Sequence, residues 1–457
     1  MSVQSSGHSL LLRTACLVLL YLLGAKPLLA QPPQPETERL VELYNNRAKR
    51  FLVKDYQLNG YFHIGNEGIT MYASPKDKEA QKPEFYLSWE ELPAFKELLE
   101  FADRNYQFEI YKRKGTTPLS PAVLSTIKIL KRNHQLLPTS RNKPLSGIRI
   151  AIDPGHIAGD MGMAKAEGRF IEMQHKGEKI QLMEGDLTLS TAYLLRDSLE
   201  KQGAEVFISR NGPNHGANGL SYQNWKKSKL KLELREKGMN GDQIKHLFSR
   251  SPEYKIYRDH FLHKDLETRA EKINYFKPDL TVIIHFNADD KNYGWKKPSQ
   301  RNFGMVFVPG SFLKYELRLP RDRFDFVRTL ISEQVKESAE LSALVMRQFE
   351  KQLQVPAVLP SEEPLYLQKL AIRLEDGVYA RNLRLCRLIN TPICYGEPLL
   401  QDNEKELHAL KNNDLQNGVI SKRIVDVANS YYKGILQYFE QEGKLNSYSK
   451  EGQEGAK

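Results

Sequence analysis

The sequence predicts an α/β fold: a mainly parallel sheet flanked by helices in three layers, preceded by a small α+β domain. Three observations support this prediction. After residue 145, strand-like apolar segments alternate with amphipathic helical segments, which is typical of a parallel sheet with helices on its faces. Leu280–Ile284 is a continuous apolar run, as expected for a strand buried on both faces. Before residue 138, the segments instead follow hairpin and short-helix patterns.

The first thirty residues have the features of an export signal. Arg13 precedes an apolar run, Ala15 to Gly24, that is shorter than the roughly 20 residues needed to span a bilayer. Ala30 then offers a small residue before Gln31-Pro32-Pro33, so residues 1–30 are predicted to be a cleavable signal peptide. An uncleaved N-terminal anchor is the alternative. Both interpretations place the remaining chain outside the cytoplasm, in the periplasm or cell envelope, and cleavage leaves no stable membrane span.

Charge and composition narrow the expected partners. Hydrophobic residues make up 40% and charged residues 27% of the chain, which is typical of a globular protein. The formal net charge is +11, and long-range attraction can draw such a protein to anionic wall polymers or membrane surfaces. Nucleic acid is not an expected partner, because the chain has an export signal and lacks arginine-rich or RNP-like motifs.

The three cysteines exclude a cysteine-based framework. Cys16 lies in the signal segment, which leaves Cys386 and Cys394 for the exported chain. Two cysteines cannot form a disulfide network or a cysteine-rich zinc knuckle. They can form one bridge or remain as two buried thiols, and buried thiols are the favoured interpretation.

Residues 34–142 are predicted to be a small α+β domain of unknown role, without a recognisable group of catalytic side chains. Hydrophobic periodicity, a Gly-rich turn and a Ser-x-x-Glu capping pattern predict its elements. These are a helix at 34–53, hairpin strands at 61–64 and 69–72, a strand at 85–87, and a helix opened by Ser88 and Glu91 that runs to Phe101. The polar, proline-containing stretch Pro138–Pro144 is the expected linker.

Residues 145–442 are predicted to form the sheet domain. Its expected strands and helices are strands 148–152, 206–209, 280–284, 303–308 and 393–395, and helices 187–202, 266–276, 326–353 and 424–439. The segments 211–263 and 309–379 exceed ordinary connections, so we expect functional insertions there. The second insertion follows the strand after His285, so we expect it to start close to that edge of the sheet. There it either blocks access to a site at the edge or shapes the groove that binds the substrate. The polar tail, residues 443–457, is expected to be disordered.

Three residues at the predicted sheet edge form a candidate zinc site. His156 follows Asp153-Pro154-Gly155, which ends the first strand of this domain; Glu184 stands just before a helix, and His285 ends an apolar strand. Two histidines and one carboxylate supply three ligands of a tetrahedral zinc and leave the fourth position for water. Each residue alone is weak evidence, because a histidine at a strand end is more often an ordinary polar residue and a Glu before a helix often stabilises the helix dipole.

Six motifs follow one another in the predicted sheet domain. They are Ile-Ala-Ile-Asp-Pro-Gly-His at 150–156, Glu184 opening an amphipathic helix, Val-Phe-Ile-Ser-Arg at 206–210, Leu-Glu-Thr-Arg-Ala-Glu-Lys-Ile-Asn at 266–274, Asp-Leu-Thr-Val-Ile-Ile-His-Phe-Asn-Ala at 279–288, and Thr-Pro-Ile-Cys-Tyr-Gly-Glu at 391–397. This order resembles the type-3 family of zinc-dependent N-acetylmuramoyl-L-alanine amidases. The resemblance covers residues 146–441 and leaves out the N-terminal unit and both insertions.

The resemblance implies a reaction and roles for four residues. In that family, the His after Asp-Pro-Gly, the Glu before the helix and the His before x-Asn-Ala bind zinc, which corresponds here to His156, Glu184 and His285. A catalytic Glu lies five residues after a Pro in a late strand, and Glu397 has this spacing from Pro392. Glu397 is then the general base and acid that hydrolyses the amide between N-acetylmuramic acid and L-alanine. By itself, Glu397 would be interpreted as a surface carboxylate. Peptidoglycan is the implied partner, and a protein activator is left open.

The late strand departs from the family pattern. The family strand is aliphatic up to its Glu and is followed by Gly-Phe and Ser-Asn, whereas residues 393–400 read Ile-Cys-Tyr-Gly-Glu-Pro-Leu-Leu. We expect this change to affect substrate preference more than the reaction. Asp153 and Asn287 either orient the ligating histidines or cap turns. The histidines in loops or insertions are expected to be solvated: His175, His215, His260 and His263.

Two other functions are compatible with these residues. A catalytically inactive wall-binding or scaffold protein could keep the fold, although such a protein has no need of His156, Glu184, His285 and Glu397 together. A zinc peptidase that cuts within the stem peptide would need the same residues. The bond that is cut distinguishes the two enzymes.

Overall fold

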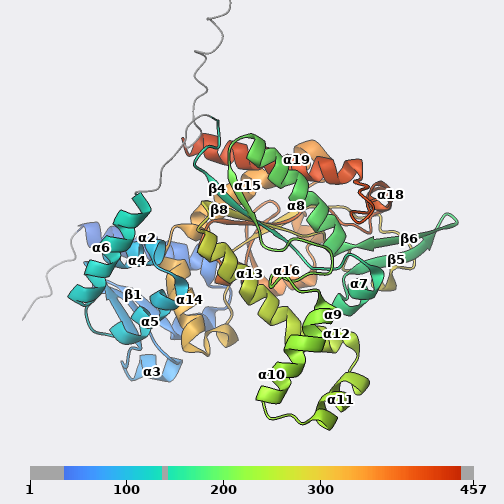
Figure 1. Ribbon diagram of the computed structural model, residues 1–457. Helices are drawn as coiled ribbons and strands as arrows, with labels where there is room; N and C mark the ends of the chain where they lie inside the picture. The colour runs from blue at the N-terminus through green and yellow to red at the C-terminus, as the bar shows by residue number, and fades with distance from the viewer. Residues whose placement is uncertain (1–34, 136–142, 444–457) are drawn as a thin grey trace, which may run out of the picture.

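A computed structural model describes residues 35–135 and 143–443 (Figure 1). The predicted signal peptide at 1–30, most of the linker at 138–144 and the tail from residue 444 lie outside the described residues. Within the described part of the chain, no helix combines the length and the apolar composition that crossing a membrane requires. Cys386 and Cys394 are both buried and free, which confirms the prediction of two thiols.

A seven-stranded sheet forms the centre of residues 143–443, with the strand order β10-β11-β9-β12-β8-β4-β7. Its strands are β4 (Arg149–Pro154), β7 (Glu205–Ile208), β8 (Leu280–Ile284), β9 (Met305–Val308), β10 (Ala371–Glu375), β11 (Val378–Arg381) and β12 (Ile393–Glu397). Four of the six neighbouring pairs are parallel, and only β9–β12 and β10–β11 are antiparallel. The predicted mainly parallel sheet is confirmed.

Helices cover both faces of this sheet (Figure 1). On one face lie α8 (Glu184–Lys201), α15 (Gln334–Gln348) and α19 (Lys422–Gln441), and on the other lie α13 (His263–Phe276) and α17 (Arg384–Leu388). Successive strand residues point to opposite faces. Thus Ile150 and Ile152 pack with α8 and α19, whereas Ala151 packs with α13 and α17. The strands have apolar residues at both odd and even positions, so both faces of the sheet are covered by helices and three layers result.

The predicted single helix at 326–353 is wrong. The chain instead forms α14 (Pro320–Ile331), α15, and a final turn at Phe349–Leu353. α14 ends at Ser332, whose ψ of 156° is extended. The buried Arg47 side chain donates hydrogen bonds to the carbonyl groups of this end: Leu330, Ile331 and Ser332. A contact from nearly three hundred residues away therefore ends the helix, and the local apolar periodicity does not reveal it.

Two hairpins were not predicted. One is β5 (Phe170–His175) with β6 (Glu178–Met183), which leads directly into α8. The other is β10 with β11, which lies at the end of the 309–379 segment and joins the central sheet through β9. Since this segment also contains α14 and α15, most of it belongs to the core. The longer parts outside these elements are 309–319 and 354–370, and the second includes α16 (Leu365–Leu370).

The N-terminal unit contains a three-stranded antiparallel sheet, and its predicted hairpin is confirmed. Its main elements are α2 (Pro35–Arg47), β1 (Phe62–Gly65), β2 (Gly68–Met71), β3 (Phe85–Ser88), α4 (Leu92–Phe101), α5 (Arg104–Lys114) and α6 (Pro121–Gln135). This unit shares one hydrophobic core with α14, where the Phe326 ring centroid lies 5.0 Å from that of Phe62. A buried ion pair between Arg104 and Asp325 also joins them. The domain division stays a prediction, and we propose that the N-terminal unit and α14 fold together.

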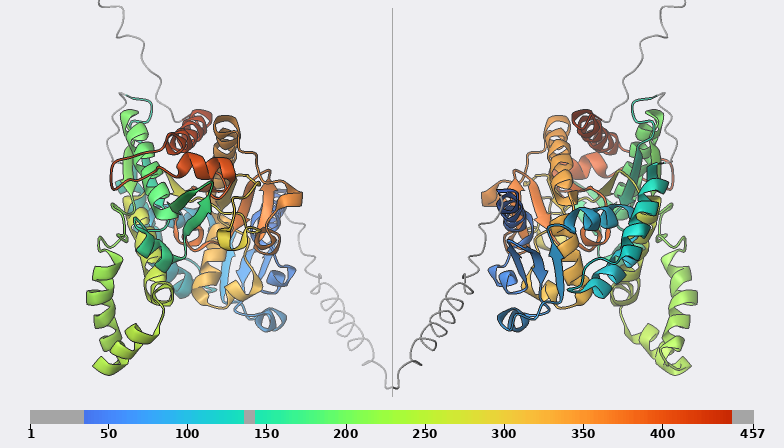
Figure 2. Two further views of the ribbon diagram at one scale, coloured as in Figure 1. Left: turned by 90° about the vertical axis from the view of Figure 1, so that its right-hand side faces the viewer. Right: turned by 90° about the vertical axis from the view of Figure 1, so that its left-hand side faces the viewer.

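Residues 222–262 form a helical arm that projects from the sheet domain (Figure 2). Its main helices are α10 (Lys231–Glu236) and α11 (Gly241–Arg250). At the base of the arm, the buried aromatic rings of Tyr222, Trp225 and Phe261 pack together with Ile157 and Ala158. The base of this predicted insertion therefore contacts the chain immediately after His156.

The shared core of the N-terminal unit and α14 can be tested by truncation and by substitution. A chain that begins at Lys143 should lose stability, because it exposes the face of α14 that the N-terminal unit covers. Replacing a buried Phe with Ala typically costs about 3–5 kcal/mol. We therefore expect Phe326→Ala in the full chain to lower the free energy of unfolding by about that amount, measured by denaturant titration. Tyr315→Ala, at a residue that is 55% exposed, is the control. Equal stability of the truncated and full chains would instead indicate a separable N-terminal domain.

Candidate metal centre and active site

The register of three parallel strands, β4, β8 and β12, brings the predicted site residues side by side at one edge of the sheet. β8 lies between β4 and β12. The Gly155 N–H donates to the Ile284 carbonyl at 2.9 Å, and the His285 N–H donates to the Gly396 carbonyl at 2.9 Å. Carboxyl ends of parallel strands share one edge of a sheet, which is the usual ligand-binding edge of α/β proteins. The residues that follow these hydrogen bonds, His156 and Glu397, therefore lie on either side of His285.

The turn that presents His156 has a restricted backbone. His156 has a φ of 57°, in the left-handed region that few non-glycine residues occupy. A Cβ atom at Gly155 would overlap the His285 ring, so this position requires glycine. Such a backbone conformation costs on the order of 1–3 kcal/mol and persists only where the surroundings fix it.

Two buried arginines fix the backbone of the turn that presents His156. Arg210 donates hydrogen bonds of 2.7–3.2 Å to the carbonyl oxygens of Pro154, Gly155 and Gly185. Arg269 donates to the carbonyl oxygens of Pro154 at 2.7 Å and His156 at 3.1 Å. Both guanidinium groups are 2% exposed, so these bonds satisfy carbonyl groups that water does not reach. The loop after β4 and the start of α8 are thereby held as one unit.

Glu184 lies between the two histidines. Its Oε2 is 3.3 Å from His156 Nε2, and its Oε1 is 2.9 Å from His285 Nδ1. The Phe286 N–H donates to Glu184 Oε1 at 3.1 Å, which fixes the carboxylate. One ligand atom from each of His156, Glu184 and His285 lies within 4.8 Å of the others, so these three residues can hold a metal ion. The structure thus brings the three predicted ligands together.

The electrostatics of this cluster favour a cation. Burial lowers the pKa of His156, but the carboxylates of Glu184 and Glu167 outweigh burial and raise its pKa to about 9. Burial lowers the pKa of His285. Glu184 is buried, which raises its pKa, yet His156 and His285 hold the pKa of Glu184 well below its usual value. The negative charge of Glu184 between the two imidazoles would be balanced by a cation bound at the same place. Imidazole nitrogen and carboxylate oxygen are ligands that suit zinc.

Glu397 lies beside this cluster at the end of β12. Its Oε2 is buried and has no hydrogen-bond partner among the described residues. Burial and the negative charge of Glu184 raise the pKa of Glu397 to about 8, and His156, Arg381 and Arg169 offset only part of this increase. The neighbouring Tyr395 ring stacks on His285 at 4.6 Å between centroids, which fixes that imidazole. A carboxyl group with an unpaired oxygen next to a candidate metal site is suited to proton transfer.

Sequence reasoning did not identify Glu167. Its carboxylate accepts hydrogen bonds from the N–H groups of Ile157 and Ala158, both at 2.9 Å, and from the Tyr257 hydroxyl at 2.7 Å. Its Oε1 also lies 3.8 Å from His156 Nδ1. The only local signal is that Glu167 ends α7 (Met161–Glu167) before a left-handed Gly168, which marks a helix end but not this contact.

The other residues considered from the sequence have different surroundings. Asp153 accepts hydrogen bonds from Ser209 and Arg269, so it stabilises the loop backbone through Arg269. Asn287 accepts from the Ala288 N–H, which is a turn-capping role, and its amide donates to the Tyr366 hydroxyl at 3.3 Å. His263 is exposed, as predicted. His175 is only partly exposed, because it contacts Glu404 and His408.

A cavity of about 960 Å³ lies at the opposite edge of the sheet from His156 and His285. Asp279, which precedes β8, and Pro392, which precedes β12, line it together with Arg104 of the N-terminal unit. These positions are at the amino ends of the strands whose carboxyl ends carry the candidate metal site. The cavity and the metal site are therefore separate features of the molecule.

A protein-family model places the chain among known proteins. The model Amidase_3, described as N-acetylmuramoyl-L-alanine amidase, matches residues 150–435. The chain belongs to this amidase family. The germination-specific N-acetylmuramoyl-L-alanine amidase of Bacillus subtilis (strain 168) is 28% identical over 145 residues, which are 32% of this chain and 41% of that protein. The matched segment thus spans less than half of the curated relative.

Solved amidase structures also match part of the chain. The CwlD amidase of Clostridioides difficile, in complex with the GerS lipoprotein, is 16% identical with a TM-score of 0.35, covering 65% of this chain and 100% of that chain. The Ami1 amidase of Mycobacterium smegmatis is 15% identical with a TM-score of 0.38, covering 65% of this chain and 99% of that chain.

Substitution of Glu167 tests whether this residue positions His156 in the candidate metal site. Loss of a partner that orients a metal-ligating residue typically reduces metal affinity 10–100-fold. We expect Glu167→Ala to weaken metal binding by about that factor. The variant lacks the carboxylate that lies beside His156 and accepts hydrogen bonds from the N–H groups of Ile157 and Ala158. Competition with a chromophoric chelator measures this affinity. Glu172→Ala removes a carboxylate paired with Lys165 and Lys179, and it should leave the affinity unchanged. Equal affinities of both variants and the unsubstituted protein would assign Glu167 a purely structural role.

Proposed function

We propose that this protein is a zinc-dependent hydrolase that cuts the amide bond between N-acetylmuramic acid and L-alanine in peptidoglycan. The observation that carries the proposal is the convergence of His156, Glu184 and His285 beside Glu397, in a chain of the amidase family. Two imidazoles and one carboxylate match the three-ligand pattern of catalytic zinc sites. Family membership indicates the type of bond, and the cluster indicates how the chain can hydrolyse it.

His156, Glu184 and His285 would hold the ion. Zinc, when bound, lowers the pKa of a coordinated water toward about 7 and polarises the scissile carbonyl group. Glu397 would accept a proton from the attacking water and return it to the leaving amine, which is the general base and acid role. Its Oε2 has no hydrogen-bond partner among the described residues, and the charges of Arg169, Arg381 and a bound cation would favour the carboxylate form that accepts a proton.

The same side chains suggest how the substrate is recognised. Arg381 lies 4.7 Å above the Tyr366 ring of α16 and 5.2 Å from the Phe307 ring, so aromatic contacts position its guanidinium group. Arginine binds carboxylates well, and stem peptides carry carboxylates. We place the stem peptide on the side of the site with Tyr366 and Arg381. These residues lie outside the family motifs, which supports a substrate preference particular to this chain.

Substitution of the ligands and of Glu397 tests the reaction. We expect His156→Ala to lose both the metal ion of this site and the activity, because one of three ligands is removed. Glu397→Gln should keep the metal and lose about 10²–10⁴-fold in rate, which is the typical contribution of acid–base catalysis. Metal content and the rate on purified peptidoglycan are measured for each variant.

Mass spectrometry of the products distinguishes the remaining functions. Release of stem peptides with a free L-alanine amino group supports the amidase, whereas cuts between stem residues support a zinc peptidase. Binding to peptidoglycan without any product would favour the wall-binding or scaffold alternative. A Glu397→Gln protein with near-normal rate would exclude Glu397 from the mechanism.

We further propose that the protein acts outside the cytoplasm, in the periplasm or cell envelope, because its substrate lies there and residues 1–30 resemble a signal peptide. A protein activator stays a prediction. N-terminal sequencing of the protein from cells should give a mature chain that begins near Gln31. A chain that begins at Met1 in the envelope would favour an uncleaved anchor, and the same chain in the cytosol would contradict export.

A further inference from the structure

A second cluster of two histidines and a glutamate joins the β5–β6 hairpin to α18 (Glu404–Leu410). His175 ends β5, and Glu404 and His408 lie on α18. One ligand atom from each residue lies within 4.8 Å of the others. His175 Nε2 is 3.2 Å from Glu404 Oε1, and the His175 and His408 ring centroids are 5.3 Å apart. The donor set is the same as that of the candidate catalytic site.

Regular secondary structure positions all three side chains. Glu404 and His408 are four residues apart, so they lie on one face of the helix. The side chain of Asn403 caps α18, and its amide donates to the backbone carbonyls of Ser299 and Arg301. His175 is the last paired residue of β5, opposite Glu178, at a hairpin turn in which Lys176 and Gly177 have φ angles of 50° and 82°. The cluster therefore does not depend on an irregular loop.

His408 provides an independent indication of a ligand. Its Nε2 is buried and has no hydrogen-bond partner among the described residues. A buried polar atom without a partner is costly, and such an atom in a folded protein is often explained by an ion or a water molecule. Coordination by this nitrogen would satisfy it. His175, which has a ligand nitrogen within 4.8 Å of one in His408, would supply a second imidazole ligand of the kind transition metals prefer.

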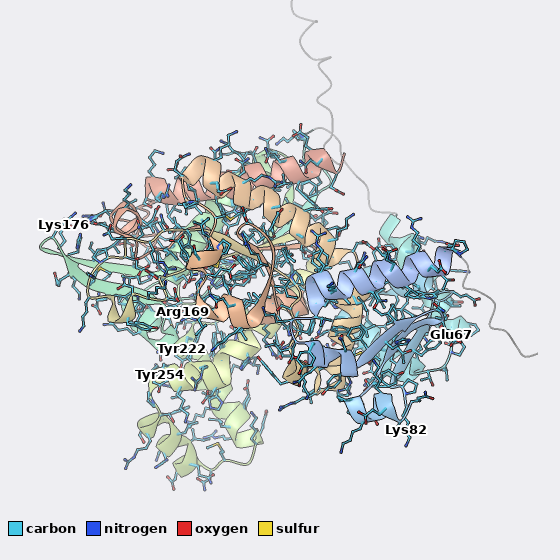
Figure 3. All side chains as sticks on the ribbon, turned by 180° about the vertical axis from the view of Figure 1, so that it is seen from behind. Glu67, Lys82, Arg169, Lys176, Tyr222 and Tyr254 are labelled. Atoms are coloured by element: carbon cyan, nitrogen blue, oxygen red, sulfur yellow. The ribbon has the colours of Figure 1, made fainter. Side chains whose placement is uncertain are left out.

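Lys176 and Gln300 are the competitors for Glu404. Lys176 Nζ is 2.8 Å from Glu404 Oε1, and Gln300 donates to Glu404 Oε2 at 3.1 Å. Lys176 is 65% exposed and lies at the tip of the hairpin (Figure 3), so its ammonium group can return to solvent. Exposed ion pairs contribute little to stability, typically below about 1 kcal/mol. Metal coordination at Glu404 therefore has a weak competitor.

We propose that His175, Glu404 and His408 bind a second transition-metal ion of the Zn²⁺ type, which fixes the β5–β6 hairpin to α18. This site is separate from the proposed catalytic site and does not depend on the proposed function. The hairpin begins at Phe170, shortly after Glu167, and ends at Met183, immediately before Glu184. A metal at its tip restrains the segment that joins two parts of the catalytic cluster.

Zinc stoichiometry of the full chain tests the second site. Metal-free protein is titrated with Zn²⁺ and examined by native mass spectrometry. We expect two Zn²⁺ per chain for the unsubstituted protein, one for His408→Gln, one for His156→Ala and none for the double variant. His246→Gln, at an exposed histidine of α11, should keep two. Lys176→Ala should bind the second ion more tightly, because it removes the competing ammonium group.

Hydrogen–deuterium exchange shows whether the ion holds the hairpin. In His156→Ala, where only the second site binds, Zn²⁺ should slow amide exchange in residues 170–183, and in the His156→Ala/His408→Gln double variant it should not. Unchanged stoichiometry and affinity in both His408→Gln and His175→Gln would overturn the proposal. So would a single Zn²⁺ per chain that His156→Ala removes completely.

Discussion

The candidate active site depends on the hydrogen bonds from Arg210 and Arg269 to the backbone after β4. His156 adopts a left-handed conformation there, and Arg269 donates hydrogen bonds to its carbonyl and to the buried carbonyl of Pro154. Two guanidinium groups supply donors in a rigid planar arrangement, and arginine keeps its charge even when buried. Asp265, 2.7 Å from Arg269, compensates that charge. Removal of either partner of such a buried pair leaves an uncompensated charge, which typically costs about 3–5 kcal/mol.

Segments far from each other in sequence complete the surroundings of His156. Glu167 comes from α7, and Tyr257, whose hydroxyl donates to Glu167, comes from the helical arm. The base of the arm also packs on Ile157 and Ala158. The arm therefore helps to fix the residues that surround the candidate metal site. A site whose ligands are held by packed neighbours needs less reorganisation when the metal or substrate binds.

The two edges of the sheet have different neighbours. The carboxyl ends of β4, β8 and β12 carry His156, His285 and Glu397, and the amino ends of β8 and β12 face the cavity that Arg104 also lines. The N-terminal unit packs on α14 at that second edge. Its core with α14 includes Phe62, Phe312 and Phe326, so the 309–379 segment is anchored on one side by the N-terminal unit. On the other side it reaches the active site through Tyr366. This arrangement connects the N-terminal unit to the site through a single continuous segment.

The sequence by itself determined five of the seven strands of the sheet, the family and the choice of the four candidate site residues. Buried strands such as Leu280–Ile284 are apolar throughout, and the chemistry-bearing residues follow strand ends in a fixed order. Only the tertiary structure decided the break between α14 and α15, the role of Glu167 and the cluster at His175. Arg47 ends α14 from a distance of 285 residues along the chain, and His175 meets Glu404 across 229 residues. Local periodicity reports which face of an element is buried, but it carries no information about which distant side chain meets it.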